Sequence, residues 1–340
     1  MNKTTVVRIG IDIGTYSIIT ARNKDKEIEL KKEINCFYPI ELNDSNKFIV
    51  NMLTQAGAPL VEVNDIIYVL GESARLLAVS MGKEFHRPMR NGVINPIEKD
   101  GFNILAVIIR SLIGDLTADE TIVYYSMPGN SLNIQTSPEY HQKILSSILI
   151  KYKQGDKIVR PYPINEAVCV VYSELTAQNR TGIGLSFGSG QTNCCYCIMG
   201  MPLIQFSIVN AGDWVDEESA KNCGENISYV NEYKKKIDLS KEPENIIERS
   251  LHFNYEIMIE NALKGVAEGI AKAGAKANPG GPVDIALAGG TASVKGFTKF
   301  FKKTLEKMKF PLTIGEVRIG NDPILSVAKG ALIAAEAHQD

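Results

Sequence analysis

Ile-Gly-Ile-Asp-Ile-Gly-Thr at residues 9–15 returns at residues 183–189 as Ile-Gly-Leu-Ser-Phe-Gly-Ser. Each copy is a short apolar run that ends in a glycine and a hydroxyl residue, which is typical of a strand entering a tight turn. A chain that builds this device once per half predicts two related lobes that close on one phosphate-bearing ligand. The copies differ at one chemically important position, which holds Asp12 in the first and Ser186 in the second.

Length and composition limit what the chain can be. Its 340 residues are too many for one ordinary core and predict two domains, and 44% hydrophobic with 22% charged residues are globular values. The net charge of −2 gives no electrostatic case for direct nucleic-acid binding. The longest apolar run, Ile104 to Ile109, is far shorter than the roughly 20 residues of a membrane span, and residues 1–5 contain no signal-peptide core. We therefore expect a cytoplasmic protein without an integral membrane segment.

Three of the six cysteines, Cys194, Cys195 and Cys197, cluster in one predicted strand. Alternate residues of a strand face opposite sides, whereas zinc ligands must converge from one side. We therefore interpret these cysteines as small buried apolar residues and not as a metal site.

The strand pattern also occurs twice. Apolar or alternating runs with turn signals between them predict two meanders of three antiparallel strands: Val6–Asp12, Ser17–Asn23 and Glu27–Ile34, then Gly182–Phe187, Thr192–Met199 and Leu203–Val209. Helical patterns and a further strand follow each meander. The expected fold class is α/β, with mixed sheets in two duplicated βββαβα lobes. Residues 36–65 carry Pro39, Gly57 and Pro59 and are expected to form a small loop-rich insertion.

The two turns are candidate phosphate loops. Glycines let the backbone approach a phosphate closely, and amides with hydroxyls supply hydrogen-bond donors. Asp12, at the end of the first strand, is a candidate Mg²⁺ ligand acting through water. The alternative for a single turn is an ordinary hairpin, but the second copy favours binding. The residues concerned are Gly14, Thr15, Tyr16 and Ser17 in the first turn and Gly188, Ser189, Gly190 and Gln191 in the second.

Two further motifs are less specific. Gly289, Gly290 and Thr291 lie between a buried strand and a helical pattern, where paired glycines admit a flat group and a helix N-terminus favours phosphate. The alternative is a strand-to-helix turn that needs no ligand. Glu232 and Lys235 share a helix face, as a solvated ion pair would, and the Lys234-Lys235-Lys236 run is interpreted as a solvated face.

Taken in order, these motifs resemble the superfamily of actins, heat-shock chaperones and sugar kinases, and within it the prokaryotic actins of the MreB and MamK type. The resemblance covers nearly the whole chain. The segments that carry it are the two turns, Ala288–Thr291 with residues 295–297, Ile164–Ala167 and Pro323–Ala331 as connecting helices, Arg87–Ile94, Ala211-Gly212-Asp213, and Glu232 with Lys235.

The resemblance implies an actin-like, ribonuclease H-like two-lobed fold that binds ATP or ADP with Mg²⁺ between the lobes. It also implies that Gly212 and Asp213 belong to the binding site, that Glu232 and Lys235 contact the nucleoside, and that Glu166 positions the attacking water. The alternative for Glu166 is a helix-capping or surface carboxylate. Ser186 stands where the family usually has an aspartate that helps to hold Mg²⁺, so slow ATP hydrolysis is expected.

The expected organisation places lobe I at residues 1–160 and 321–340, with an insertion at about 35–77. Lobe II takes residues 161–320, with a short helical insertion at about 213–275 and no appended peptide-binding domain. The expected function is a homopolymeric cytoskeletal filament, with any adaptor unidentified. Two alternatives stay open: a monomeric nucleotide-binding regulator or chaperone-like factor, and a small-molecule kinase.

Overall fold

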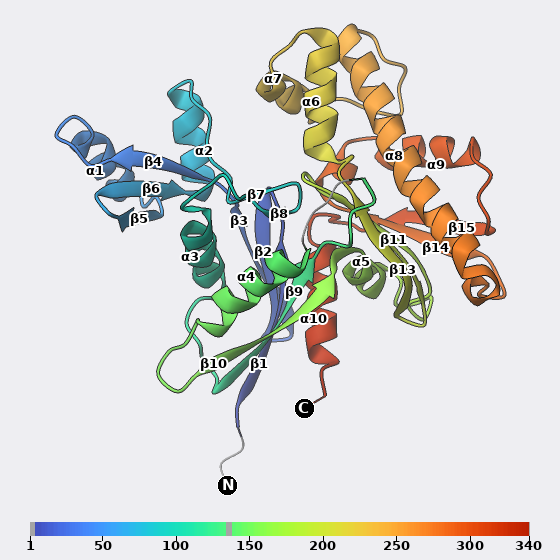
Figure 1. Cartoon of the computed structure of the whole chain (residues 1–340), viewed down its shortest axis with the longest axis horizontal. Coiled ribbons are helices and arrows are strands. Elements are labelled where there is room, and N and C mark those ends of the chain that lie inside the picture. The colour runs from blue at the N-terminus through green and yellow to red at the C-terminus, as the bar shows by residue number, and fades with distance from the viewer. Residues whose placement is uncertain (1–3, 134–137, 340) are drawn as a thin grey trace.

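The computed structural model describes residues 4–133 and 138–339. Two five-stranded mixed sheets dominate it (Figure 1). We call the part built on the first sheet lobe I and the part built on the second sheet lobe II.

The sheet of lobe I has the order β10-β9-β1-β2-β3. Its strands are β1 (Val6–Ile13), β2 (Ser17–Lys24), β3 (Glu27–Ile34), β9 (Glu120–Met127) and β10 (Ile158–Asn165). β2 pairs antiparallel with both β1 and β3, which confirms the first predicted meander. β9 lies parallel to β1 and to β10. The helices α3 (Gly101–Ile113) and α4 (Pro138–Ile150) contribute Ile104, Leu105 and Leu145 to the core of this lobe.

Lobe II repeats the plan with the order β13-β12-β11-β14-β15. Its strands are β11 (Gly182–Phe187), β12 (Thr192–Ile198), β13 (Met201–Ile208), β14 (Val283–Ala288) and β15 (Ile314–Ile319). β12 pairs antiparallel with β11 and β13, and β14 lies parallel to β11 and to β15, so the second meander is confirmed as well. Its helices are α6 (Gly212–Cys223), α7 (Ile227–Lys234), α8 (Ile246–Ala273) and α9 (Phe297–Glu306), with short 3-10 turns η1 (Gly274–Ala277) and η2 (Gly290–Ser293).

Two helices lie between the sheets (Figure 1). α5 (Glu166–Glu174) packs on β11 and β12, and α10 (Ser326–Glu336) packs on β1, β2 and β9. The helices also contact each other, and a Cβ on Gly330 would lie 1.9 Å from the backbone oxygen of Cys169. Only glycine permits this crossing, so the contact between the lobes runs through tightly packed helix backbones.

The segment predicted to be a loop-rich insertion is a folded module, and that prediction is wrong. β4 (Phe37–Glu41), β6 (Ile66–Leu70) and β5 (Leu60–Val63) form a three-stranded sheet. The helices α1 (Lys47–Gln55) and α2 (Gly71–Ser80) add Ile49, Leu53, Ala74 and Ala78 to its core. Pro39 is compatible with this sheet because β4 is an edge strand. A short hairpin, β7 (Met89–Arg90) and β8 (Val93–Ile94), follows.

The clustered cysteines lie as the alternation predicts. Cys195 and Cys197 pack with α5 and α10, whereas Cys194 faces the other core of lobe II, and all three are fully buried. Burial raises the pKa of the Cys194 thiol, as expected for a neutral apolar side chain. None of the helices within the described ranges combines the length and apolar character that a membrane crossing requires.

Candidate functional site

The two predicted turns have the same geometry. In the first, the Gly14 amide donates to the Ser17 carbonyl at 3.0 Å, and in the second the Gly188 amide donates to the Gln191 carbonyl at 3.1 Å. Both turns line one cleft of about 270 Å³ between the lobes. The duplication visible in the sequence is therefore a duplication of backbone structure on opposite walls of a single pocket.

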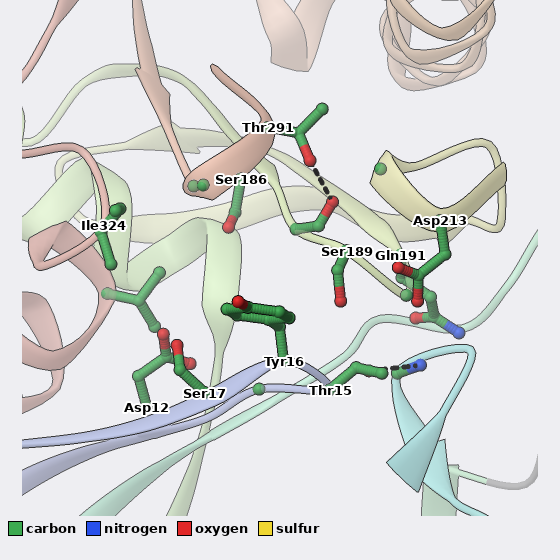
Figure 2. A pocket seen from close by; sticks show the side chains of 18 of the residues that line it. Asp12, Thr15, Tyr16, Ser17, Ser186, Ser189, Gln191, Asp213, Thr291 and Ile324 are labelled. Carbon is green, nitrogen blue, oxygen red and sulfur yellow. Dashed lines mark hydrogen bonds between the residues drawn. The ribbon is translucent and has the colours of Figure 1, made fainter. Parts of the chain in front are cut away.

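Other predicted segments hold the second turn in place. The amides of Gly212 and Asp213, at the start of α6, donate to the carbonyls of Gly188 and Ser189 at 3.0 and 2.8 Å. The Thr291 hydroxyl donates to the same Gly188 carbonyl at 2.8 Å (Figure 2). The second turn, the N-terminus of α6 and the Gly289–Thr291 loop thus form one continuous wall.

Two partly buried carboxyl groups face the cleft. Asp12, the last but one residue of β1, accepts a hydrogen bond from Ser126 at 3.0 Å, and Ser126 in turn accepts from the Ile13 amide at 2.8 Å. Glu166 begins α5, because Asn165 caps that helix by accepting from the Ala167 amide at 2.9 Å. Burial, opposed by the Ser126 hydrogen bond, raises the pKa of Asp12. Burial and the nearby Asp12 charge raise the pKa of Glu166.

Neutral donors surround Glu166. Its Oε2 accepts from the side-chain amide of Asn193 at 2.9 Å, and hydrogen bonding by Asn193 and Ser186 opposes the rise in the pKa of Glu166. Ser186 lines the cleft, and Figure 2 shows it on the wall opposite Asp12. Ser186 therefore places a hydroxyl where an aspartate would place a further carboxyl group near Asp12 and Glu166, while Asp213, which also lines the cleft, pairs with Arg87.

The structure brings nearly all predicted site residues together. Those that line the cleft are Asp12, Gly14, Thr15, Tyr16, Ser17, Glu166, Gly188, Ser189, Gly190, Gln191, Gly212, Asp213, Lys235, Gly289, Gly290 and Thr291. Glu232 is the exception, because its half-exposed carboxylate pairs with Lys235 at 2.5 Å outside this lining. We therefore leave Glu232 out of the proposed binding set.

The interpretation of Lys234 as part of a solvated face is wrong. Its side chain is 9% exposed and forms an ion pair of 2.7 Å with Asp216, which is 3% exposed. The Lys234 ammonium also donates to the Gly212 carbonyl at 3.1 Å, so it helps to place the N-terminus of α6. The pairing partner lies on another helix, and the local lysine run gives no sign of it.

Sequence reasoning missed several other lining residues. These are Lys32, Gly92, Asn231, Lys234, Val294, Ile324 and Val327. Most belong to elements whose approach to the cleft depends on tertiary packing. Val327, for example, lies in the first turn of α10 and Ile324 in the turn just before it, a segment that was predicted only as a connecting helix.

Contacts cross the mouth of the cleft near residues 87–92. Arg87 Nη1 and Asp213 Oδ2 form an ion pair of 2.9 Å, and the Arg87 guanidinium lies 5.6 Å from the centre of the Tyr16 ring. Gln191 donates to the Asn91 carbonyl at 2.7 Å. Figure 2 shows the Tyr16 ring between the first turn and the wall that carries Ser186 and Ser189. The first turn, the 87–92 segment and the second turn therefore enclose this end of the pocket.

The chemistry of the cleft fits a divalent cation brought in with phosphate. Nowhere in residues 4–133 and 138–339 do three or more His, Cys, Asp or Glu side chains gather as a metal-binding group. Among the residues that the structure describes, Asp12 and Glu166 nevertheless have no cationic partner, and Ser189 Oγ and Gln191 Oε1 are buried without hydrogen-bond partners. Mg²⁺ typically uses one or two carboxylates, water and substrate phosphates, and this set can supply such a first or outer shell.

A family model described as volactin matches residues 7–335, which is almost the entire chain. The chain belongs to the volactin family. No curated protein matches this volactin-family chain.

Several solved structures have a similar fold. A structure titled "MamK double helical filament" has a TM-score of 0.72 at 17% identity and covers 98% of this chain and 100% of its own. MreB5 of Spiroplasma citri bound to ADP gives 0.63 at 15%, covering 98% and 97%. The ethanolamine utilization protein EutJ from Carboxydothermus hydrogenoformans gives 0.55 at 16%, covering 98% and 91%. The expected actin-like two-lobed fold is confirmed, and at these identities the likeness concerns the fold alone.

Proposed function

We propose that this chain binds ATP with Mg²⁺ in the cleft between its lobes, hydrolyses it slowly and polymerises into cytoskeletal filaments. One observation carries the binding step: two copies of the same glycine turn and the Gly289–Thr291 loop line a single pocket. Backbone amides and hydroxyls on both walls suit phosphates, which accept many hydrogen bonds at close range. ADP, which has the same groups except the last phosphate, would use the same site.

In this proposal Asp12 holds Mg²⁺ through water, and the metal would neutralise charge on the phosphates. Glu166 orients the attacking water and accepts its proton, because it is a carboxylate of the cleft that lies near Asp12 and at a fixed helix start. Ser186 lines the cleft without adding charge, so the electrostatic support for the metal is weaker than with an aspartate. We therefore expect ATP binding to be easily measured and ATP hydrolysis to be slow.

Polymerisation rests on the fold. One structure of the same fold is a double helical filament of MamK. Head-to-tail contacts between subunits that do not close into a ring extend into filaments. Nucleotide would favour the lobe arrangement that aligns both ends of such a contact, which is a shift of populations. We also propose a cytoplasmic location. Lobe I would take residues 1–160 and 321–340, and lobe II residues 161–320. The boundary near residue 160 falls inside β10, a strand of the lobe I sheet.

Calorimetry and sedimentation test the proposal. Titration with ATP and Mg²⁺ should reveal one site of micromolar order, about −8 kcal/mol, that Asp12→Ala weakens. Pelleting and electron microscopy with ATP, with ADP and without nucleotide should show ATP-dependent filaments that persist for long periods. Absence of heat and of any thermal shift at high ATP concentration would refute binding.

Ser186 favours one alternative, a monomeric nucleotide-binding regulator that hydrolyses little. Nucleotide binding with only monodisperse particles across salt and nucleotide conditions would support that alternative. ATP consumption that depends on an added metabolite would instead indicate a small-molecule kinase.

A further inference from the structure

Lobe II binds both backbone polar groups of one residue of lobe I, the amide and the carbonyl of Gly129. Asn193 on β12 and Ser207 on β13 are paired neighbours in the sheet. The Gly129 amide donates to Asn193 Oδ1 at 2.9 Å, and the Ser207 hydroxyl donates to the Gly129 carbonyl at 2.9 Å. Gly129 follows β9 of lobe I by two residues, so this contact joins the two lobes.

The same asparagine reaches the candidate catalytic carboxylate. Because its oxygen accepts from Gly129, its nitrogen is turned toward Glu166 and donates to Oε2 at 2.9 Å. Asn193 is 1% exposed, so bulk water does not compete for either bond. One side chain therefore connects the lobe I backbone to Glu166 with both ends of its amide.

The position of Gly129 against β13 is tightly constrained. Ser207 also forms backbone hydrogen bonds with the residues that follow Gly129. Its amide donates to the Asn130 carbonyl and its carbonyl accepts from the Leu132 amide, both at 2.9 Å. A Cβ on Gly129 would lie 2.6 Å from the backbone carbon of Phe206. A shift of this segment relative to β13 must therefore break or bend the bonds that orient Asn193.

We propose that Asn193 is a positioning residue that links the seating of Gly129 on lobe II to the orientation of the Glu166 carboxylate. Hydrolysis then depends on how the two lobes are seated, although Asn193 itself does not line the cleft. The inference rests on the proposed function for the role of Glu166. The hydrogen-bonded link itself is a property of the nucleotide-free chain.

Two substitutions at Asn193 separate the two halves of the link. Asn193→Asp keeps an acceptor for the Gly129 amide but replaces the donor to Glu166 with a repelling carboxylate. Asn193→Ala removes both. Gly129→Ala displaces the seat without touching Glu166, and Asn133→Ala is the matched control, since Asn133 bonds across the lobes to Asn210 without contacting Glu166 or Gly129.

Hydrogen exchange of the peptide containing Gly129, measured without nucleotide, gives the first readout. Exchange should be faster in Asn193→Ala, and close to the parent in Asn193→Asp and Asn133→Ala.

The second readout is steady-state phosphate release. Asn193→Asp, Asn193→Ala and Gly129→Ala should lower kcat by roughly a hundredfold with little change in KM, because misplacing one catalytic group costs about that much. Asn133→Ala should leave both constants unchanged.

Three results would overturn the inference. The first is equal exchange of the Gly129 amide in the parent and Asn193→Ala. The second is a parent-like kcat in Asn193→Asp. The third is joint loss of ATP binding and kcat in all three variants, which would indicate a merely structural role. A parent protein that releases no phosphate refutes the proposed hydrolysis instead, and the exchange experiment still decides whether the link exists.

Discussion

At the scale of single residues, Ser186 is the position where this chain departs most clearly from the pattern that it otherwise resembles. Ser186→Asp places a third carboxylate beside Asp12 and Glu166. With Mg²⁺ and ATP the added charge should raise phosphate release by roughly a hundredfold, since one preorganised electrostatic group is worth about that much. Ser80→Asp, exposed at the end of α2, is the control and should leave the rate unchanged. A Ser186→Asp rate at or below the parent rate would mean that the serine is not the limiting group.

Glu166 gives a second prediction for hydrolysis. Glu166→Ala removes the group proposed to orient the attacking water, so phosphate release should fall by about a hundredfold or more. ATP binding should stay largely intact by calorimetry, because the phosphate turns are unchanged. Parent-like hydrolysis in Glu166→Ala would show that another group does this work.

The partly buried acid pair also predicts a pH dependence of stability. Raised pKa values mean that the folded chain holds more protons than the unfolded chain above about pH 4, the ordinary carboxyl range. The free energy of unfolding of the nucleotide-free protein should therefore fall as pH rises from about 5 to 8. Asp12→Asn removes one titrating group and lowers the pKa of the other, so urea unfolding curves of this variant should depend less on pH. Equal pH slopes for parent and variant would contradict the burial argument.

At the scale of elements, the connection between α6 and α7 depends on one buried ion pair. Lys234→Met leaves the buried Asp216 without its cationic partner, with only the hydrogen bond from Asn231 remaining, and should lower the free energy of unfolding by about 3 kcal/mol. Lys235→Met is the matched control: its ion pair is about half exposed, so the loss should be about 0–1 kcal/mol. Urea unfolding measures both. Similar losses in the two variants would mean that burial of the first pair has no special importance.

The elements that sequence reasoning identified are those with local signals. The meanders around residues 9–15 and 183–189 carry period-two patterns and glycine turns, and both are confirmed. β10 was missed because Pro161 and Pro163 argue against a strand, yet β10 is an edge strand, where missing amide donors are tolerated. β15, an edge strand of the lobe II sheet, was missed because its charged, half-exposed residues hide a short apolar pattern.

The residues of the candidate site also fall into those with a local sequence signal and those without one. Glycine and hydroxyl turns are visible in sequence because their chemistry depends on adjacent residues. Lys234 and Asn193 were not predicted, because their partners Asp216, Gly129 and Glu166 lie on other elements and only tertiary packing brings them together. The fold is therefore easier to predict from the sequence than the tertiary contacts that support the site.

At the scale of the whole molecule, the contacts across the cleft mouth should control nucleotide exchange. Arg87→Ala removes a partly exposed ion pair and a cation–π contact, which together are worth about 1 kcal/mol. Dissociation of a fluorescent ATP analogue should therefore be roughly fivefold faster by stopped flow. Arg90→Ala, exposed on the neighbouring hairpin, should leave the dissociation rate unchanged. Unchanged release from Arg87→Ala would show that the cleft opens without breaking this pair.

The packing of α10 on β1 and β2 has a consequence for biosynthesis. Ile19 and Ala21 of β2 are buried by Ala328 and Leu332 of α10, roughly 300 residues later in the chain. At about 5–20 residues per second, a ribosome needs tens of seconds to make the intervening stretch. During that time the first-made sheet presents an uncovered apolar face, whereas the sheet of lobe II is covered by helices from its own stretch of sequence. The lobe synthesised first is therefore the last to be completed, and a nascent chain of this protein offers a long-lived target for ribosome-associated chaperones.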